Sequence, residues 1–578
     1  MPHTSSSHAG RLPKGEAVYR CGQSPRAPRT DESLARMSRW AEARFGIFVH
    51  WGVSAVPAGW WKGRRVEGLS EWIQFKERIP CREYAALAGE FNPSGFDAGE
   101  WVRRVADAGA KYFVYTAKHH DGFAMYRSSV SDFNIADATP FGRDPLAELQ
   151  EACREQGVML GLYYSQMIDW ADPDAIGPQC NDWDFDRAAG DFHRYWHRKA
   201  MPQLEELLTR YGPIGLLWFD MPAGIPAECA QEAFQLVRRL QPRAVVNSRL
   251  CDGGPFDYQS MDDNYFNNHL PDRDWETAAT TNESWAYVEG ADRWKPAAAL
   301  CESIAYAVSR NGNYLLNVGP DASGRFPQPA VDQLANVGRW LRRAGDGIFA
   351  AGSADIPTTY DWGCVTRRGN ACYLHVTKAD RKAVTLAALS PAPNRAVDKA
   401  SGESLSLVSH ANGSLTVTLA SPTDALPQTI ELQFKAPPKA TALATQVPGE
   451  DFRLDVWNAS RPTPSIHRWD FSLLEAGTYR VVLLSKESAS HLQPMWWGDG
   501  LHGRLRTGCT EQLFTLSDDG REPYPILYYW MLIRSEIGHL HAASAGPQFL
   551  EIHGLPICDS KWINSAVNMV GVRLERLP

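Results

Sequence analysis

Residues 109–123 read GAKYFVYTAKHHDGF, and this stretch decides the class of fold. The run from Tyr112 to Lys118 is short and mostly apolar, which is typical of a strand buried on both faces. Two polar residues, His119 and His120, follow directly. A buried strand with polar side chains just beyond its end is the pattern of a parallel sheet that carries a functional site at one edge.

Similar runs recur between residues 31 and 347 and alternate with helical patterns. The other strand candidates are Phe45 to His50, Met159 to Ser165, Gly215 to Asp220, Ala244 to Arg249, Thr280 to Tyr287 and Tyr314 to Val318. Between them, apolar residues repeat every three or four positions and stop at Gly or Pro. No Gly-rich dinucleotide turn follows a strand, so the pattern favours a (β/α)8-like (TIM) barrel over a doubly wound sheet.

Polar side chains stand at the ends of these strands. They are His50, His119, His120, Tyr164, Asp220 and Arg249. In a barrel, side chains at the carboxyl ends of the strands converge on one pocket even when tens of residues separate them in sequence. The sequence therefore predicts a site at the mouth of the barrel.

The pattern changes after Gly347 to a period of two residues, as in Leu415, Val417 and Leu419. Residues 437–449 contain three prolines and predict a linker, after which the alternation resumes. We expect a disordered leader at 1–30, a catalytic barrel at 31–350, an antiparallel β domain at 351–437 and a second β-rich domain at 450–578, a candidate for carbohydrate binding. Its rings at Trp496, Trp497 and Trp530 suit either a core or a sugar platform, and we favour the core.

Charge and cysteine content exclude several classes of function. The 578 residues hold 59 Lys and Arg against 67 Asp and Glu, a formal net charge of −8, so no broad basic surface for nucleic acid or anionic lipid is expected. The eleven cysteines show no C-x-x-C pair, which argues against a zinc ribbon or a disulfide framework. No signal peptide and no run of ~18 apolar residues is recognisable. We therefore expect a soluble, cytoplasmic protein without nucleic-acid or membrane partners.

Asp220 ends an otherwise apolar run, Leu216 to Phe219. Burying an ionised carboxylate beside Trp and Phe costs free energy. Such a group is kept only where charged or hydrogen-bonding partners stabilise it or where its function requires it. A lone aspartate after a strand is more often a helix cap or part of a salt bridge than a catalyst. Arg249 ends the next strand candidate, however, and would keep Asp220 ionised and available as a nucleophile.

The three histidines allow two interpretations. His50, His119 and His120 could ligate zinc with Asp220, as in a metal-dependent hydrolase. We favour sugar binding without a metal, because neutral imidazoles both donate to and accept from hydroxyls and no H-x-H pair stands on one strand.

A glycosidase needs a second carboxyl group beside the nucleophile. The loop between Asp257 and Glu276 supplies several candidates, one of which is enough. They are Asp262, Asp263, Asp272, Asp274 and Glu276.

Three motifs together resemble the alpha-L-fucosidases of glycoside hydrolase family 29. They are RFGIFVHWG at 44–52, GAKYFVYTAKHHDGF at 109–123 and NGNYLLNVGP at 311–320. Shorter matches are SEW at 70–72, GLYYS at 161–165, LWFD at 217–220, WE at 275–276 and SW at 284–285. The resemblance covers about residues 31 to 355, and the first β domain stands where this family has a β-sandwich.

The resemblance implies a retaining exo-glycosidase that removes terminal alpha-L-fucose from glycans or glycosides with two carboxyl groups and no metal or other cofactor. Asp220 falls at the family's nucleophile. The residues that would line the fucose pocket are His50, Glu71, Trp72, His119, His120, Tyr164 with Tyr163 as its alternative, Trp218, Arg249 and Trp285.

The sequence also departs from the family pattern. Met221 and Pro222 follow the nucleophile, where many relatives have Gly. The acid/base position varies in the family, and counting back from Trp275 and Glu276 favours Asp263, with Glu276 as the rival. A non-catalytic fucose-binding protein on the same barrel is the alternative function, because Asp in place of the usual Glu can reflect lost activity.

Overall fold

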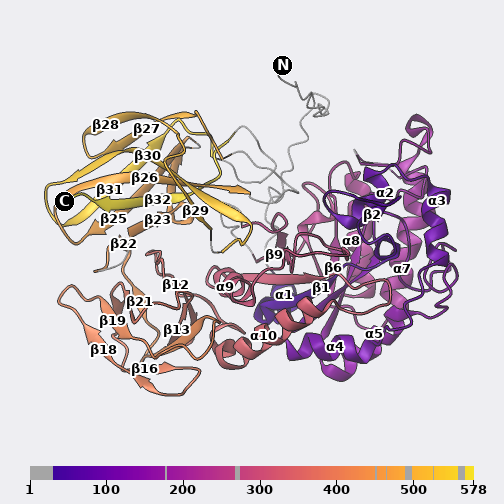
Figure 1. Cartoon of the computed structure of the whole chain (residues 1–578), viewed down its shortest axis with the longest axis horizontal. Coiled ribbons are helices and arrows are strands. Elements are labelled where there is room, and N and C mark those ends of the chain that lie inside the picture. The colour runs from indigo at the N-terminus through magenta and orange to yellow at the C-terminus, as the bar shows by residue number, and fades with distance from the viewer. Residues whose placement is uncertain are drawn as a thin grey trace.

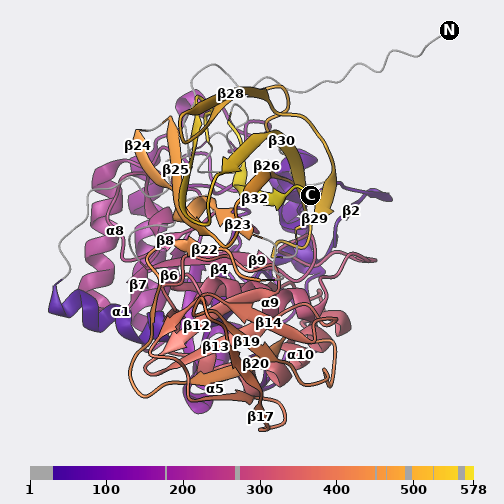
Figure 2. The same cartoon turned by 90° about the vertical axis from the view of Figure 1, so that its left-hand side faces the viewer.

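The computed structural model describes residues 30–578 apart from 176, 178, 267–273, 449–451, 464, 489–496, 525 and 558–565. Residues 1–29 of the expected leader, Trp496 and Asp272 lie outside these described residues. Figure 1 shows a helix-covered barrel and two β units stacked beside it, with helix α9 (Ala297–Val308) between the barrel and the first β unit. Figure 2 shows the second β unit above the first, with the barrel behind both.

The barrel is built on one sheet of eight strands, in the order β7, β6, β5, β4, β1, β10, β9, β8, and every neighbouring pair is parallel. A further parallel bridge between Asn247 and Tyr258 joins the two edges. The strands are β1 (Phe45–Val49), β4 (Tyr112–Lys118), β5 (Met159–Tyr164), β6 (Leu216–Phe219), β7 (Val245–Val246), β8 (Gln259–Ser260), β9 (Trp275–Thr280) and β10 (Gly312–Val318). The predicted TIM-like barrel is confirmed.

Helices cover the outer face of the sheet. Besides α9, the main ones are α1 (Asp31–Ala43), α4 (Ala98–Asp107), α5 (Pro145–Gln156), α7 (Met201–Arg210), α8 (Ala227–Leu240) and α10 (Gln328–Ala344). Helix α5 shows how the sequence sets their ends. The Asp144 side chain accepts from the backbone at its start, Pro145 opens the first turn, and Gly157 ends it in the left-handed region with φ 67°.

Alternate side chains of each strand face opposite sides of the sheet. One apolar cluster fills the barrel interior and includes Phe48, Tyr112, Tyr163 and Trp218. A second cluster, which includes Tyr164 and Phe219, packs between the sheet and the helices. The inner set points into the barrel, so the position of a residue within a strand decides whether it can reach the site.

The strand expected from Thr280 to Tyr287 is wrong, because β9 occupies Trp275–Thr280 and ends where that segment was to begin. Asn282 explains the end: its side chain accepts from the backbone of Ser284, a turn that competes with a strand. The strand expected from Ala244 to Arg249 is reduced to two residues, and Arg249 lies in the 3-10 turn Ser248–Leu250.

The first β unit is a sandwich. One sheet has the order β11 (Gly352–Ser353), β12 (Gly363–Arg368), β13 (Ala371–Val376), β20 (Gln428–Gln433), β16 (Arg395–Asp398), β17 (Ser404–Leu405). The other has β14 (Ala383–Leu386), β19 (Leu415–Thr418) and β18 (Leu407–Ser409). One core joins them, with Leu374 and Ile430 from the first sheet and Val384 and Val417 from the second.

The segment predicted as a linker carries two short strands, β21 (Lys439–Ala440) and β22 (Ala444–Thr445). The first pairs with β15 (Leu389–Ser390) of the first β unit, and the second pairs with β25 (Ile466–Leu473) of the second unit. The segment therefore pairs with strands of both β units, which its proline content did not indicate.

The second β unit also has two sheets around a core of its own. The first sheet holds, in this order, β22, β25, β31 (Gly546–His553), β27 (His502–Thr507) and β28 (Thr510–Thr515). The second sheet holds, in this order, β23 (Phe452–Asp455), β32 (Met569–Arg576), β26 (Gly477–Ser488), β30 (Trp530–Ala542) and β29 (Arg521–Pro523). On β26, Val481 and Leu483 face this core, whereas Val482 and Leu484 join the apolar cluster of the barrel. The unit thus packs directly on the barrel. Trp497 and Trp530 are both buried, as favoured from the sequence.

Among the described residues, nine cysteines are present and all nine are free thiols. No helix in this described part combines the length and the apolar character that crossing a membrane requires.

Candidate active site

Residues that follow different strands meet at the carboxyl end of the barrel. His50 follows β1, His119 and His120 follow β4, and Asp220 follows β6. Arg249 lies in the turn after β7 and Asp263 comes shortly after β8. Contacts among these side chains, which are far apart in sequence, join them into one group.

Asp220 is the most highly connected carboxylate of the group. Its Oδ2 accepts a hydrogen bond from the Tyr163 hydroxyl at 2.9 Å, and its Oδ1 lies 3.2 Å from Nη1 of Arg249. Its backbone N–H donates to Oε1 of Gln166 at 3.0 Å. Burial raises the pKa of Asp220 above its usual value and nearby Asp263 adds to this, while Arg249 and Tyr163 act in the opposite direction.

Arg249 links the two acids that the sequence singled out. Its Nη2 lies 2.5 Å from Oδ1 of Asp263, while Nη1 contacts Asp220. Nη2 also donates to the carbonyl of Met261 at 2.7 Å, and the guanidinium sits 4.6 Å from the centre of the Trp218 ring. One guanidinium therefore contacts both acids and brings the two carboxyl groups to the same part of the site.

The expectation for Tyr164 is wrong, and Tyr163 takes its place. Tyr164 points to the helix side of β5, where its hydroxyl donates to Gln203 of α7 at 2.9 Å. Tyr163 points into the barrel, stacks on Trp218 with ring centres 5.6 Å apart and donates to Asp220. Adjacent strand residues face opposite sides of the sheet, so only one of the two tyrosines can reach the site.

The three histidines line the same opening as neutral groups. The ring of His119 lies 4.2 Å from His120 and 5.7 Å from His50, centre to centre. Burial lowers the pKa of His50 to about 4 and holds those of His119 and His120 well below their usual value. Neutral imidazoles can both donate and accept, which suits the recognition of sugar hydroxyls.

Two of these rings already have hydrogen-bond partners. Nδ1 of His50 is 2.7 Å from Oδ1 of Asn317, and Nδ1 of His120 is 2.6 Å from the Ser165 hydroxyl. Within the described part of the chain, no three His, Cys, Asp or Glu side chains are arranged to hold a metal ion. Both rings are thus oriented by neutral hydrogen-bonding groups.

Aromatic rings form the walls. Trp72 contacts the ring of His120 at 5.0 Å, and Trp285 contacts that of His50 at 5.0 Å, centre to centre. Glu71 lies beside them and is buried; its Oε2 accepts from the backbone of Ala286 at 3.0 Å. Among the described residues its buried Oε1 has no hydrogen-bond partner.

Glu276, the rival acid, lies below the site inside the barrel and is fully buried. Its carboxylate accepts hydrogen bonds from the hydroxyl of Tyr112 at 2.7 Å, the indole of Trp218 at 3.2 Å and the hydroxyl of Tyr258 at 3.2 Å. Burial raises the pKa of Glu276 to about 7. Trp218 stands between Glu276 and Arg249, so this geometry favours Asp263 as the acid that meets substrate.

Sequence reasoning missed two supporting residues, Gln166 and Asn317. Gln166 accepts from the backbone of Asp220 and donates to the carbonyl of Arg249 at 2.9 Å, so it ties the two neighbouring strand ends together. Asn317 binds His50 and donates to the carbonyl of Trp285 at 2.6 Å. Asn317 stands near a strand end inside the motif at 311–320, and Gln166 directly follows the motif at 161–165; these positions are the signal that could have found them.

The residue after the nucleophile candidate has a backbone conformation that glycine adopts readily. Met221 adopts φ 56°, in the left-handed region that glycine enters without a steric penalty. Its backbone N–H donates to Oδ1 of Asp220 at 2.9 Å. The local backbone thus keeps a conformation suited to Gly although the side chain is larger, with a cost typical of functional sites.

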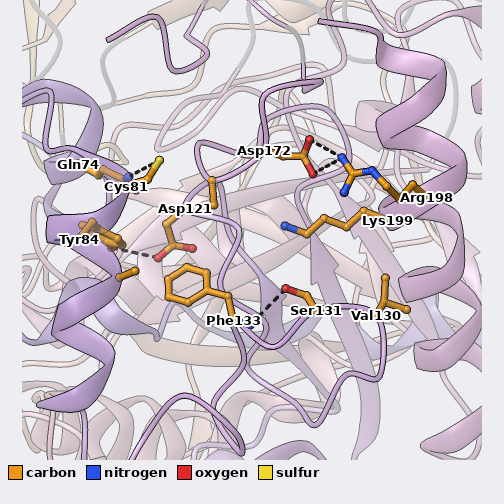
Figure 3. Close-up of a pocket in the computed structure, with 12 residues that line it drawn as sticks. Gln74, Cys81, Tyr84, Asp121, Val130, Ser131, Phe133, Asp172, Arg198 and Lys199 are labelled. Atoms are coloured by element: carbon orange, nitrogen blue, oxygen red, sulfur yellow. Dashed lines mark hydrogen bonds and ion pairs between the residues drawn. The ribbon is translucent and has the colours of Figure 1, made fainter. Parts of the chain in front are cut away.

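A cavity of about 360 Å³ is lined by residues that include Tyr84, Asp121, Asp172 and Lys199. Figure 3 shows Asp121 bound to Tyr84 on one side and the Arg198–Asp172 ion pair on the other, with the Lys199 side chain between them. None of the site residues named above lines this cavity. It is therefore distinct from the group around Asp220.

Comparison with known proteins gives a consistent picture. A family model described as Alpha-L-fucosidase matches residues 20–346. Tissue alpha-L-fucosidase of Rattus norvegicus is 33% identical over 336 residues, which are 54% of this chain and 70% of the rat protein.

Two solved structures extend the likeness. The alpha-L-fucosidase of Vibrio sp. strain EJY3 aligns with a TM-score of 0.87 and 33% identity, over 94% of this chain and 98% of its own. An alpha-L-fucosidase of Bacteroides thetaiotaomicron, trapped as a covalent intermediate with 2-fluoro-fucosyl fluoride, aligns with a TM-score of 0.64 and 27% identity, over 72% of this chain and 98% of its own.

Proposed function

The chain belongs to the alpha-L-fucosidases of glycoside hydrolase family 29, and from this premise we propose how its own residues carry out retaining hydrolysis of a terminal alpha-L-fucose. Asp220 is the nucleophile, Asp263 is the acid/base, and the neutral histidines, Glu71 and the tryptophans bind the sugar. The observation that carries the assignment is the bridge of Arg249 between the two carboxyl groups at the barrel mouth.

In the first step, a carboxylate oxygen of Asp220 attacks the anomeric carbon while the protonated Asp263 donates its proton to the leaving oxygen. The bond to the leaving group breaks and a fucosyl ester of Asp220 forms. In the second step, Asp263 takes a proton from water, and the water oxygen displaces Asp220 from the anomeric carbon. Fucose leaves with its original configuration, and both carboxyl groups return to their starting states.

Arg249 serves both steps because it contacts both acids. A cation beside Asp220 favours the ionised nucleophile and partly offsets the effect of burial. When Asp263 gives up its proton, the same guanidinium lies 2.5 Å from the carboxylate that forms. Trp218 supports the guanidinium from below.

The pocket walls account for recognition of the sugar. His50, His119 and Glu71 present donors and acceptors to ring hydroxyls, whereas Trp72 and Trp285 cover apolar faces of the sugar, including its 6-deoxy methyl group. The second β-rich domain is a candidate for carbohydrate binding that stays a prediction.

The test is hydrolysis of nitrophenyl alpha-L-fucoside beside the corresponding galactoside and xyloside, with proton NMR of the fresh product. We expect turnover of the fucoside alone and alpha-L-fucose as the first anomer. Beta-L-fucose as the first product would contradict double displacement. Binding of fucose without any turnover would instead identify a non-catalytic fucose-binding protein.

A further inference from the structure

The segment that follows Asp263 is bound by the second β unit rather than by the barrel alone. We propose that Lys486 and Asn568 of this unit are positioning residues for Asp263, so that the second β unit is a working part of the active site. The inference rests on the proposed role of Asp263 as the acid/base.

Hydrogen bonds to Asn568 and Lys486 join this loop to the second β unit. The hydroxyl of Tyr265 donates to Oδ1 of Asn568 at 2.8 Å. The ammonium of Lys486 donates to the carbonyl of Phe266 at 2.6 Å and lies 3.8 Å from the centre of the Tyr265 ring. The Trp530 ring also contacts the Tyr265 ring, with ring centres 5.3 Å apart.

All of these groups are buried. Tyr265 and Asn568 have no exposed surface, and Lys486 and Phe266 are each 2% exposed. A buried ammonium is costly unless its charge is compensated, and here a carbonyl and the face of a ring provide the compensation. Both partners belong to the Asp263 loop, so Lys486 is satisfied by the loop in its present position.

The two positioning residues are themselves fixed to each other. Lys486 lies on β26, and its backbone N–H donates to the carbonyl of Asn568, just before β32, at 2.9 Å. Strand β26 is buried on both faces, since Leu484 joins the barrel core and Leu483 joins the core of its own sandwich. The contacts to the loop therefore come from a rigid part of the second unit.

The inner side of the same loop is attached to strand β9. Oδ1 of Asn264 accepts from the backbone of Thr280 at 2.9 Å and from Lys295 at 2.8 Å, and the Tyr265 carbonyl accepts from the Thr277 hydroxyl at 2.9 Å. The loop after Asp263 is thus held between β9 and the second β unit.

The barrel holds the residues next to Asp263 from the side of β9. The backbone N–H groups of Met261 and Asn264 donate to the carbonyls of Glu276 at 2.7 Å and Ala278 at 2.9 Å. The next two residues, Tyr265 and Phe266, are the ones bound by Asn568 and Lys486. The second β unit therefore supplies the outer half of the constraint.

Loss of this constraint should affect proton donation more than nucleophilic attack. Proton transfer requires the acid within hydrogen-bond reach of the leaving oxygen, and a displacement of about 1 Å can cost up to ~10²-fold in rate. Asp220 is held by Tyr163, Gln166 and Arg249, which do not depend on Lys486. The effect should therefore grow as the leaving group becomes poorer.

The experiment compares kcat/KM for methyl alpha-L-fucoside, a poor leaving group, with that for nitrophenyl alpha-L-fucoside in full-length Tyr265→Phe and Lys486→Met. We expect the methyl fucoside to lose ~10-fold or more relative to the nitrophenyl fucoside. Ser303→Ala is the matched control, because it removes a different hydrogen bond between the units, from the Ser303 hydroxyl to the Ile526 carbonyl at 2.8 Å. It should leave the ratio unchanged.

Tyr265→Phe removes a single oxygen atom, so it keeps the test decisive if Lys486→Met does not fold. Unchanged ratios in Tyr265→Phe, or an equal change in Ser303→Ala, would overturn the inference. Asp263→Ala is measured in parallel: if it lacks the leaving-group dependence, the acid/base assignment fails. If Asp263→Ala shows the dependence and Tyr265→Phe does not, only the positioning role is wrong.

Discussion

The Tyr163 hydroxyl donates a hydrogen bond to Oδ2 of Asp220 at 2.9 Å, from a strand adjacent to the one that ends at Asp220. This bond helps to keep a buried carboxylate ionised, since it lowers the pKa of Asp220 against the larger effect of burial. A nucleophile must be ionised to attack. Because Tyr163 points towards Asp220, its hydroxyl helps to set the lowest pH at which Asp220 is ionised and the enzyme is active.

Tyr163→Phe and Tyr164→Phe form a matched pair. Tyr163→Phe removes a donor to a carboxylate and should lower kcat/KM roughly 10- to 100-fold. It should also move the acidic limb of the pH profile of kcat/KM to higher pH, because the pKa of Asp220 rises further. Tyr164→Phe should leave the profile in place and cost about 1 kcal/mol of stability through its lost bond to Gln203. A shift in Tyr164→Phe alone would reverse the assignment.

Asp263→Asn should remove the basic limb of the same profile and leave the acidic limb in place. In the active form Asp220 is ionised while Asp263 still holds its proton, so the acidic limb reports Asp220 and the basic limb reports loss of the proton from Asp263. Nitrophenyl alpha-L-fucoside is the right substrate, because its good leaving group needs little protonation. A basic limb that persists unchanged in Asp263→Asn would show that Asp263 is not the group that must stay protonated.

Asp263→Ala and Glu276→Gln separate the acid/base from its rival. Without a proton donor, Asp263→Ala should slow poor leaving groups by ~10²-fold or more beyond its effect on nitrophenyl fucoside. Glu276→Gln should keep the wild-type dependence on the leaving group, because Trp218 separates Glu276 from Arg249 and the site. The opposite pattern of rates would make Glu276 the acid.

Glu276 should instead affect stability, and in a defined range of pH. Its pKa is raised from 4.5 to about 7 in the folded protein, so unfolding releases a proton between these values. The folded state therefore loses up to about 3 kcal/mol as pH rises from about 4.5 to about 7. Glu276→Gln lacks this loss, so its melting temperature relative to wild type should be higher at pH 8 than at pH 5. A difference independent of pH would mean that Glu276 is not held neutral.

The strands with continuous apolar runs could be predicted because their sequence alone requires burial on both faces. Tyr112–Lys118 is an example, with the predicted and observed bounds the same. Strand β8 could not, since it consists of Gln259 and Ser260 and exists through its pairing with β9. The strand expected from Thr280 failed because apolar content does not reveal that the Asn282 side chain turns the chain.

The site could be placed at the barrel mouth, but side-chain direction could not be read for every residue. Within one strand the alternation is fixed, yet nothing in the sequence aligns the inner face of β5 with that of β6. In the structure Tyr163 is the register partner of Trp218, and this puts Tyr163 rather than Tyr164 on the inner face. A one-residue difference in register exchanges the two roles.

The contact of the second β unit with the Asp263 loop was also beyond sequence reasoning. Lys486 lies 220 positions from Phe266, and although the apolar run from Val481 to Leu484 indicates a strand buried on both faces, it does not identify the loop as a partner. The buried charge at Lys486 was the one local irregularity that could have drawn attention to it.

The most direct test of the account is peptide mapping by mass spectrometry after inactivation with 2-fluoro-fucosyl fluoride. The 2-fluoro substituent slows both steps because it destabilises their oxocarbenium-like transition states, while the good fluoride leaving group keeps the first step fast enough for the fucosyl ester to accumulate on the nucleophile. We predict one 2-fluoro-fucosyl group on Asp220, with no label in Asp220→Gly and restored turnover of nitrophenyl fucoside by that variant when azide is added. A label on Asp263 or on another residue, or full turnover by Asp220→Gly without azide, would contradict it.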